Sequence, residues 1–409
     1  MGRRPSVMAS GQIRELWRRA ISWPVYPGFT RRWGSLLYLG GPKSSPKLDL
    51  ATAQRLTVIR FDGMGDLVAI TGFLRELRSS APKARISLVI RGEWEPLMRT
   101  CPYVDEVVPF VLSSYRRFAP LHWHRDLWQF ARRELWPRRP ECVVVPQTSF
   151  SFFEIRTLAF WSRSPRRVGW SEYGQGSGGS RPVGEQLLNV VMPMDIAEHE
   201  ADKCYRLLEW MGGRVADRRL ELWPAAEEKI EARSRATSLR PAGGKLIALG
   251  IGASQAGRIW PIERFMELCR AVTEFHSARF VTLGGQDCAG PGGLFAAALN
   301  GLGVNLAGQL TLRETAAFLG ECDLFIGNDS GPMHLAAAAG CPVIEISGWP
   351  GGAPRSDAAS PWRMGPYCQR RVIVQPSGNG EPWHLQIEQV SVEQVMKGAL
   401  SLLGPGNER

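Results

Sequence analysis

Short apolar runs alternate with helical patterns of apolar residues along most of the chain beyond residue 50. In the second half, strand-like runs lie at residues 246–250, 280–283, 304–306, 324–326 and 343–346. Helical patterns separate them at residues 262–273, 294–299, 312–319 and 332–339. Alternation with about 20 residues per unit predicts a parallel sheet with helices on both of its faces.

The first half repeats this alternation with more interruptions. Strands are predicted at residues 56–60, 86–90, 107–111, 142–145 and 188–191, and helices at residues 67–78, 201–211 and 227–238. Pro109 lies inside one of these strands and indicates the edge of a sheet, because proline cannot donate a ladder hydrogen bond. Two such halves predict an α/β chain of two facing Rossmann-like domains, with a ligand cleft beside the carboxyl ends of the strands.

The length of 409 residues suits two domains with additions. We expect a first domain at residues 51–225 that carries an insertion at 112–139, and a second domain at residues 226–390. A C-terminal helix and tail at residues 391–409 are expected to pack back onto the first domain. A mobile loop is predicted at residues 174–179, from the sequence GQGSGG.

Residues 1–50 form a basic and aromatic N-terminal extension. Its arginines and aromatic residues are interleaved: Arg14, Trp17, Arg18, Arg19, Trp23, Tyr26, Phe29, Arg31, Arg32, Trp33 and Tyr38. Such a mixture suits the interface of an anionic bilayer. Pro24 and Pro27 exclude one long amphipathic helix, so packing of the extension on the first domain is an equal alternative.

Net charge is divided unevenly along the chain. Residues 1–240 hold 38 Lys and Arg against 25 Asp and Glu, whereas residues 241–409 hold 12 against 14. This division predicts an acidic partner for the first half: an anionic membrane surface, a phosphorylated substrate or, least favoured, a nucleic acid, since no nucleic-acid-binding motif accompanies the charge. A basic surface that is merely solvated is the alternative.

Eight cysteines without C-x-x-C spacing predict reduced core thiols and no structural metal site. The chain contains no apolar run of about 18 residues and no signal-peptide pattern, so we expect a cytoplasmic protein.

Residues 327–340, with the sequence GNDSGPMHLAAAAG, carry the clearest chemical signal. Pro332 suits the first position of a helix, Ser330 or Gly331 suits its cap, and Gly340 suits its end. The unpaired N–H groups and the dipole of such a helix start favour a phosphate there. Asp329 and His334 flank the turn. A capped turn that binds nothing is the alternative.

Two further strand ends carry polar residues. Gly63 and Gly65 allow a sharp turn before Asp66, which is either a helix cap or a carboxylate base in the cleft. Arg258, in the sequence GASQAGRIWP, precedes another helix start and offers a bidentate grip on phosphate. An ordinary surface arginine is the alternative.

Together, in this order, these three motifs resemble the heptosyltransferases of glycosyltransferase family 9, over residues 55–350. The resemblance implies a GT-B fold and inverting, metal-independent transfer from a nucleotide-diphosphate sugar, with an ADP-sugar favoured. It also implies an anionic glycolipid acceptor, the lipopolysaccharide core, at the cytoplasmic face of the inner membrane. No cofactor is implied.

The resemblance assigns roles by position, with Asp66 as the catalytic base. Donor-binding residues are expected to be Gly252, Ser254, Arg258, Gln286, Asp287, Asp329, Ser330, Gly331, Pro332, Met333 and His334. Residues expected on the acceptor side are Arg60, Gly63, Gly65, Arg166 and Arg167. Arg258 stands where relatives usually have a lysine. Residues 285–287 replace the glutamate that holds the ribose in many relatives, so the nucleotide stays open.

The chemistry of the residues agrees with sugar transfer. Such transfer needs a base for the acceptor hydroxyl and stabilisation of the departing diphosphate. With the ordinary carboxylate pKa of about 4, Asp66 would be a weak base. Two alternatives remain at this point: a non-catalytic GT-B scaffold that binds glycans or nucleotide sugars, and a dinucleotide-dependent oxidoreductase, which would need the G-x-G-x-x-G spacing that the first strand lacks.

Overall fold

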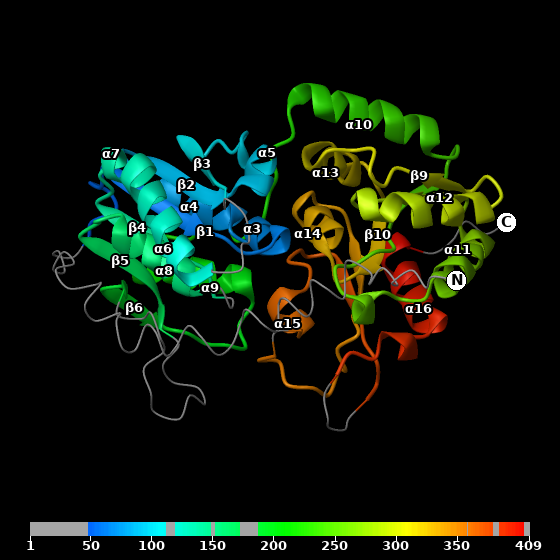
Figure 1. Ribbon diagram of the computed structural model, residues 1–409. Helices are drawn as coiled ribbons and strands as arrows, with labels where there is room; N and C mark the ends of the chain where they lie inside the picture. Colours follow the sequence, from blue (N-terminus) through cyan, green and yellow to red (C-terminus); the bar gives the residue numbers. More distant parts are fainter. Residues whose placement is uncertain are drawn as a thin grey trace, which may run out of the picture.

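The computed structural model describes residues 48–111, 119–148, 152–171, 187–357, 359–378 and 384–404. They form two α/β lobes side by side, each built on a six-stranded parallel sheet (Figure 1). Most of the N-terminal extension, part of the predicted insertion and the predicted loop at 174–179 lie outside the described residues.

The first lobe is built on a sheet in the order β3-β2-β1-β4-β5-β6. Its strands are β1 (Arg55–Arg60), β2 (Arg85–Arg91), β3 (Glu106–Phe110), β4 (Cys142–Val145), β5 (Arg166–Ser171) and β6 (Val190–Pro193). Its helices are α3 (Met64–Val68), α4 (Thr71–Ser80), α5 (Glu95–Met98), α6 (Ala119–Phe130), α7 (Trp136–Arg138), α8 (Phe152–Trp161) and α9 (Glu200–Trp210). β3, which contains Pro109, is an edge strand, as the sequence predicts.

The helix predicted at residues 67–78 is two helices, α3 and α4, with a break at Ala69 and Ile70. The Thr71 hydroxyl donates a hydrogen bond to the carbonyl of Val68 at 2.8 Å, a local bond that competes with continuing the helix. The break matters for function because α3 is left as a short helix that contacts α14 (Gly331–Ala338) of the other lobe.

The second lobe has the order β12-β11-β10-β7-β8-β9. Its strands are β7 (Lys245–Gly250), β8 (Ala278–Thr282), β9 (Gly303–Asn305), β10 (Leu324–Asn328), β11 (Val343–Ile346) and β12 (Arg371–Val374). Its other helices are α10 (Ala226–Leu239), α11 (Ile262–Phe275), α12 (Ala289–Ala298), α13 (Leu312–Gly320), α15 (Pro361–Met364) and α16 (Val392–Leu403). The interiors of β7, β10 and β11 are buried, which explains their continuous apolar runs.

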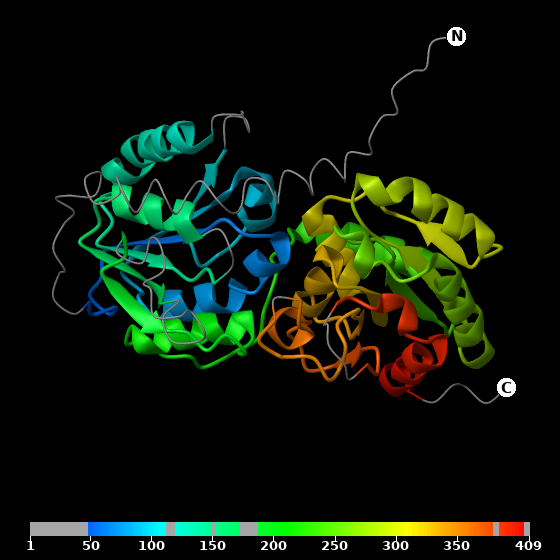
Figure 2. The same cartoon turned by 60° about the horizontal axis from the view of Figure 1, so that its bottom comes forward.

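The C-terminal helix α16 corrects one prediction. It packs on α11 and on β10 to β12 of the second lobe, and not on the first domain (Figure 2). Val395 and Ala399 of α16 are fully buried in the core that also contains Trp260 and Ile346. The amphipathic pattern of this helix shows that it has a buried face, but it does not reveal which lobe covers that face.

In each sheet, chain order reverses beside the first strand of the lobe, at β1/β4 and at β7/β10. Ligands of open α/β sheets bind outside the carboxyl ends of the strands at such a reversal. The turns after β1, β7 and β10 are the three motifs that the sequence singles out, so the topology brings them to the functional edges of the two sheets.

Candidate active site

The turn after β10 leads directly into α14. Ser330 is the N-cap of α14, and Pro332 is the second helical residue, one position later than predicted. The Ser330 hydroxyl donates to the carbonyl of Asn328 at 3.1 Å and makes no cap hydrogen bond to the helix. Gly340, at φ 81°, follows the C-cap, as predicted. The turn therefore presents a helix start that its own side chains do not cap.

The turn after β1 holds Asp66 at the third position of α3. The backbone N–H of Gly63 donates to Asp66 Oδ2 at 3.2 Å, so the carboxylate closes the turn from inside the helix and is not its N-cap. Arg60 Nη2 lies 3.6 Å from Asp66 Oδ1. The Asp66 side chain keeps 17% of its surface exposed, which leaves it accessible to a substrate hydroxyl.

The pKa of Asp66 is raised to about 8, first by burial and then by the neighbouring charge of Asp62. Arg60 opposes the rise without cancelling it, and its Nε donates to Asp62 Oδ1 at 2.8 Å. Asp66 is therefore a stronger base than the ordinary carboxylate that the sequence predicts.

The two lobes meet at this point. A Cβ added at Gly65 would lie 2.6 Å from Nε2 of His334, and a Cβ at Gly331 would collide with the end of the Met64 side chain. These close approaches put the N-terminal turns of α3 and α14 face to face. Asp66 and the turn of residues 330–334 consequently belong to one interdomain site.

The cationic side of the site is an ion pair in the second lobe. Arg258 lies in a 3-10 turn (Ala256–Arg258), and its Nη1 is 2.7 Å from Asp329 Oδ2. Arg258 Nε is buried and makes no hydrogen bond among the described residues. Burial raises the pKa of Asp329, and Arg258 opposes that rise. The Arg258 side chain is thus held by Asp329 while 22% of its surface stays exposed.

His334 completes this side of the site. Burial, followed by the charges of His199 and Arg258, lowers the pKa of His334 to about 3. The imidazole is therefore neutral at physiological pH, so that one ring nitrogen can donate a hydrogen bond and the other can accept one.

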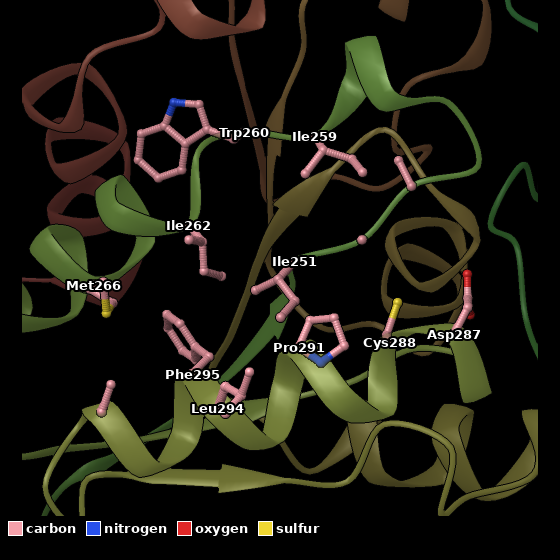
Figure 3. A pocket seen from close by; sticks show the side chains of 13 residues that line it. Ile251, Ile259, Trp260, Ile262, Met266, Asp287, Cys288, Pro291, Leu294 and Phe295 are labelled. Carbon is pink, nitrogen blue, oxygen red and sulfur yellow. The ribbon is translucent and has the colours of Figure 1, made fainter. Parts of the chain in front are cut away.

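The remaining predicted donor residues lie outside the turn at 328–334, but the carbonyl of Gly252 accepts from Asn328 Nδ2 at 3.5 Å. Gly252 and Asp287 border a cavity of about 570 Å³ between α11 and α12 (Figure 3). Its other lining residues are mostly apolar: Ile251, Ile259, Trp260, Ile262, Met266, Pro291, Leu294 and Phe295. No residue of the turn at 328–334 lines it. Ser254 and Gln286 are exposed and do not line the cavity, but each is next in sequence to a residue that does.

Two of the predicted acceptor-side arginines face inward. Arg60 and Arg167 are only 1% and 3% exposed. Arg167 donates to the carbonyls of Leu187 and Ser164, both at 2.7 Å. Internal groups therefore hold both side chains in this structure, and a contact with the acceptor substrate stays a prediction. Arg166, at the start of β5, is partly exposed.

A second contact between the lobes was missed at the level of sequence. Glu200, at the start of α9, is 2% exposed and accepts from Lys203 Nζ at 2.7 Å and from Arg363 Nη2 at 2.9 Å. The Thr148 hydroxyl also donates to Glu200. Nearby, His199 Nε2 lies 3.0 Å from the carbonyl of Gly365. The sequence signal for this contact was the presence of charged residues, Glu200 and Lys203, inside an amphipathic helix pattern. That pattern does not show that these residues are buried.

We expect Arg363→Ala to lower the free energy of unfolding by about 1–3 kcal/mol, because it removes one cation from a buried carboxylate. Burial alone would raise the pKa of Glu200, but Lys203 and Arg363 outweigh it and hold that pKa below its ordinary value. The stabilisation is therefore present above the unfolded pKa of about 4.5 and is lost as pH falls. Urea unfolding at pH 7 and at pH 4 measures both effects.

Arg355→Ala is the matched control for this prediction. Arg355 lies in the same segment and stacks on Trp362 at 4.1 Å, but it forms no ion pair with Glu200. Its loss should cost less than about 1 kcal/mol. Equal losses in the two variants would contradict a special role for the contact between Glu200 and Arg363.

Comparison with known proteins decides the family. Residues 167–374 match the sequence profile of glycosyltransferase family 9 (heptosyltransferase). The chain belongs to glycosyltransferase family 9. It is 25% identical over 309 residues to lipopolysaccharide heptosyltransferase 2 of Salmonella typhimurium, which covers 72% of this chain and 82% of that protein. The corresponding Escherichia coli protein is 24% identical over 312 residues. The chain is thus a glycosyltransferase, and the oxidoreductase alternative falls away.

Solved structures agree on the fold. A family 9 glycosyltransferase from Veillonella parvula superposes with a TM-score of 0.70 at 22% identity and covers 88% of this chain and 99% of its own. E. coli heptosyltransferase WaaC with ADP gives 0.64 at 15% identity and covers 85% of this chain and 100% of its own. The two facing parallel-sheet lobes are therefore a GT-B fold, as the sequence predicts.

Gly65→Ala should lower the kcat/KM of this glycosyltransferase by about 10²-fold, because the new Cβ displaces His334 and separates Asp66 from the opposite turn. Gly290→Ala is the control, since a Cβ there meets nothing within 4 Å. Steady-state kinetics of both variants measure the difference. Unchanged kcat/KM in Gly65→Ala would show that catalysis does not need the observed approach of the lobes.

Proposed function

We propose that this glycosyltransferase moves a heptose from an ADP-activated donor to a hydroxyl of the lipopolysaccharide core, with inversion and without a metal ion. The observation that carries the proposal is the approach of Asp66 to the turn of residues 330–334 across the interdomain seam. A base on one lobe then faces an anion-binding helix start on the other.

Each wall of the site supplies one half of the chemistry. Asp66 accepts the proton of the acceptor hydroxyl as the new glycosidic bond forms, and its raised pKa makes that transfer more favourable. Arg258 and the start of α14 stabilise the diphosphate that leaves from the opposite face of the sugar. Attack and departure from opposite faces invert the anomeric centre in one displacement. This division of labour needs no metal ion.

The relatives support the choice of donor and acceptor. Curated relatives are named lipopolysaccharide heptosyltransferases, and E. coli WaaC has been solved with ADP and with ADP-2-deoxy-2-fluoro heptose. We infer that residues 51–225 bind the acceptor and residues 226–390 the donor. No described helix is long and apolar enough to cross a membrane. We further infer a place at the cytoplasmic face of the inner membrane, which residues 1–50 contact.

A thermal-shift screen with ADP-, GDP-, UDP- and dTDP-sugars tests the donor. A ligand at a hundredfold excess over its Kd stabilises the native state by about 2.7 kcal/mol, which such a screen detects. ADP-heptose should give the largest shift, and mass spectrometry should then show heptose added to a heptose-deficient core, with or without EDTA. Binding without transfer would favour the non-catalytic scaffold, and loss of transfer in EDTA would contradict the metal-free mechanism.

A further inference from the structure

Glu345 is a carboxyl group in the middle of the second sheet. It lies on β11 between two fully buried isoleucines, in the sequence VIEI, and is itself 1% exposed. Its side chain forms a hydrogen bond with Ser347, while Oε2 has no hydrogen-bond partner among the described residues. A buried carboxyl oxygen without a hydrogen bond destabilises the folded state, so a functional reason for Glu345 at this position is expected.

Strand register puts Glu345 beside the donor side of the active site. Glu345 is paired with Gly327 of β10, and Asp329 follows two residues later. Asp329 lies in the bend directly after β10, so Glu345 and Asp329 come from neighbouring strands at the carboxyl edge of the sheet. Gly327 carries no side chain that could separate them. A Cβ at Gly365 would lie 2.9 Å from Glu345 Oε2, which places this oxygen beside Gly365, whose carbonyl meets His199 of the first lobe.

The charges around Glu345 favour its neutral form. Burial and then the charge of Asp329 raise the pKa of Glu345 well above its ordinary value. Two cations oppose this rise: Arg258, which is paired with Asp329 at 2.7 Å, and Arg371 of β12. His199 reaches the same place through the carbonyl of Gly365, and its own pKa is lowered by burial. Burial and the charge of Asp329 therefore shift Glu345 toward its protonated form.

We infer that Glu345 is a positioning residue for the donor, which supplies a hydrogen bond to Asp329 when the diphosphate engages Arg258. Before the donor binds, Asp329 is balanced by Arg258. A diphosphate that engages Arg258 draws this cation away, which leaves Asp329 buried beside Glu345. The Glu345 hydroxyl then donates to the Asp329 carboxylate, an acid–carboxylate contact of the short, charge-assisted kind.

This inference rests on the proposed function, because it assumes that a diphosphate engages Arg258. It extends that function to a residue that makes no contact with the donor itself. Glu345 would hold Asp329 ionised and correctly oriented toward the sugar, while the Arg258 guanidinium binds the diphosphate.

Two variants separate a proton-donating role from a packing role. Glu345→Gln keeps a neutral side chain that can donate a hydrogen bond, whereas Glu345→Leu keeps the volume but donates nothing. We expect Glu345→Gln to bind ADP-heptose within about threefold of the parent, and Glu345→Leu to bind it at least about tenfold more weakly. Calorimetry at pH 7 gives both dissociation constants, and thermal unfolding confirms that both variants are folded.

The pH dependence of binding provides the second readout. The parent should lose affinity for ADP-heptose as pH rises and Glu345 ionises beside Asp329, and Glu345→Gln should not. Glu76→Gln is the control, because Glu76 is also a buried carboxylate, 4% exposed, but pairs with Arg75 in the first lobe. Its binding curve should follow that of the parent.

Three outcomes would overturn the inference: equal weakening in Glu345→Gln and Glu345→Leu, no weakening in Glu345→Leu, or the same loss of affinity with rising pH in Glu345→Gln and the parent. Failure of the parent to bind any ADP-sugar would instead contradict the proposed function, so the two failures are distinguishable.

Discussion

Replacing Asp66 by Asn should lower kcat by about 10²–10⁴-fold, the range expected for removal of a positioned general base. The amide keeps the size of the side chain and can still accept from the N–H of Gly63, so α3 should stay in place. ADP release coupled to an NADH signal measures kcat, and direct titration measures donor binding, which should be nearly unchanged. Near-normal turnover would remove Asp66 from the role of base.

The same group should set the pH profile. Because the pKa of Asp66 is raised to about 8, the ionised base increases as pH rises, and kcat should rise with pH and level off above about 8. Asp62→Asn is the matched variant. It removes a neighbouring negative charge and frees Arg60 to engage Asp66, which should shift this rise to lower pH. An unchanged profile in Asp62→Asn would contradict the electrostatic origin of the shift.

Asp66→Asn should also be more stable than the parent at neutral and alkaline pH. A carboxyl group whose folded pKa lies above its unfolded value of 3.8 favours the folded state fully at low pH, and this contribution is lost as pH rises toward about 8. The stability difference between variant and parent should therefore grow over that interval. A loss of activity together with a gain in stability is the signature expected of a group held for catalysis.

Arg258→Ala should raise the donor KM by at least about tenfold and also lower kcat, because the guanidinium is expected to serve both the bound diphosphate and the leaving group. It also removes the cation that faces Asp329 and Glu345, so the variant should be less stable than the parent. Initial rates over a range of ADP-heptose concentrations separate the two kinetic effects, and thermal unfolding reports the third.

Arg258→Lys distinguishes charge from geometry, because a lysine keeps the charge without the bidentate edge. We expect it to recover most of the donor affinity, because a lysine keeps the positive charge that attracts the diphosphate. Arg270→Ala is the control, since Arg270 is exposed on α11 of the same lobe. A lysine variant as weak as the alanine variant would show that the planar shape of the guanidinium is essential.

Local features of the chain determined the fold class and three turns. Buried apolar runs separated by helical patterns are sufficient to predict two parallel sheets, because strand and helix periods differ. Pro109 predicted an edge strand from its missing N–H, and residues 327–340 predicted the turn into α14 from residue types that favour the start and the end of a helix. These features depend on neighbours in the sequence, so they can be read without the tertiary structure.

What only the tertiary structure decided depends on residues that are distant in the chain. The packing of α16 on the second lobe and the burial of Arg60 and Arg167 follow from what each element meets after folding. The raised pKa of Asp66 and the neutral state expected for Glu345 have the same origin. Desolvation and the charge of a group's surroundings are set by packing, and an identical carboxylate in a solvated turn would have its ordinary pKa.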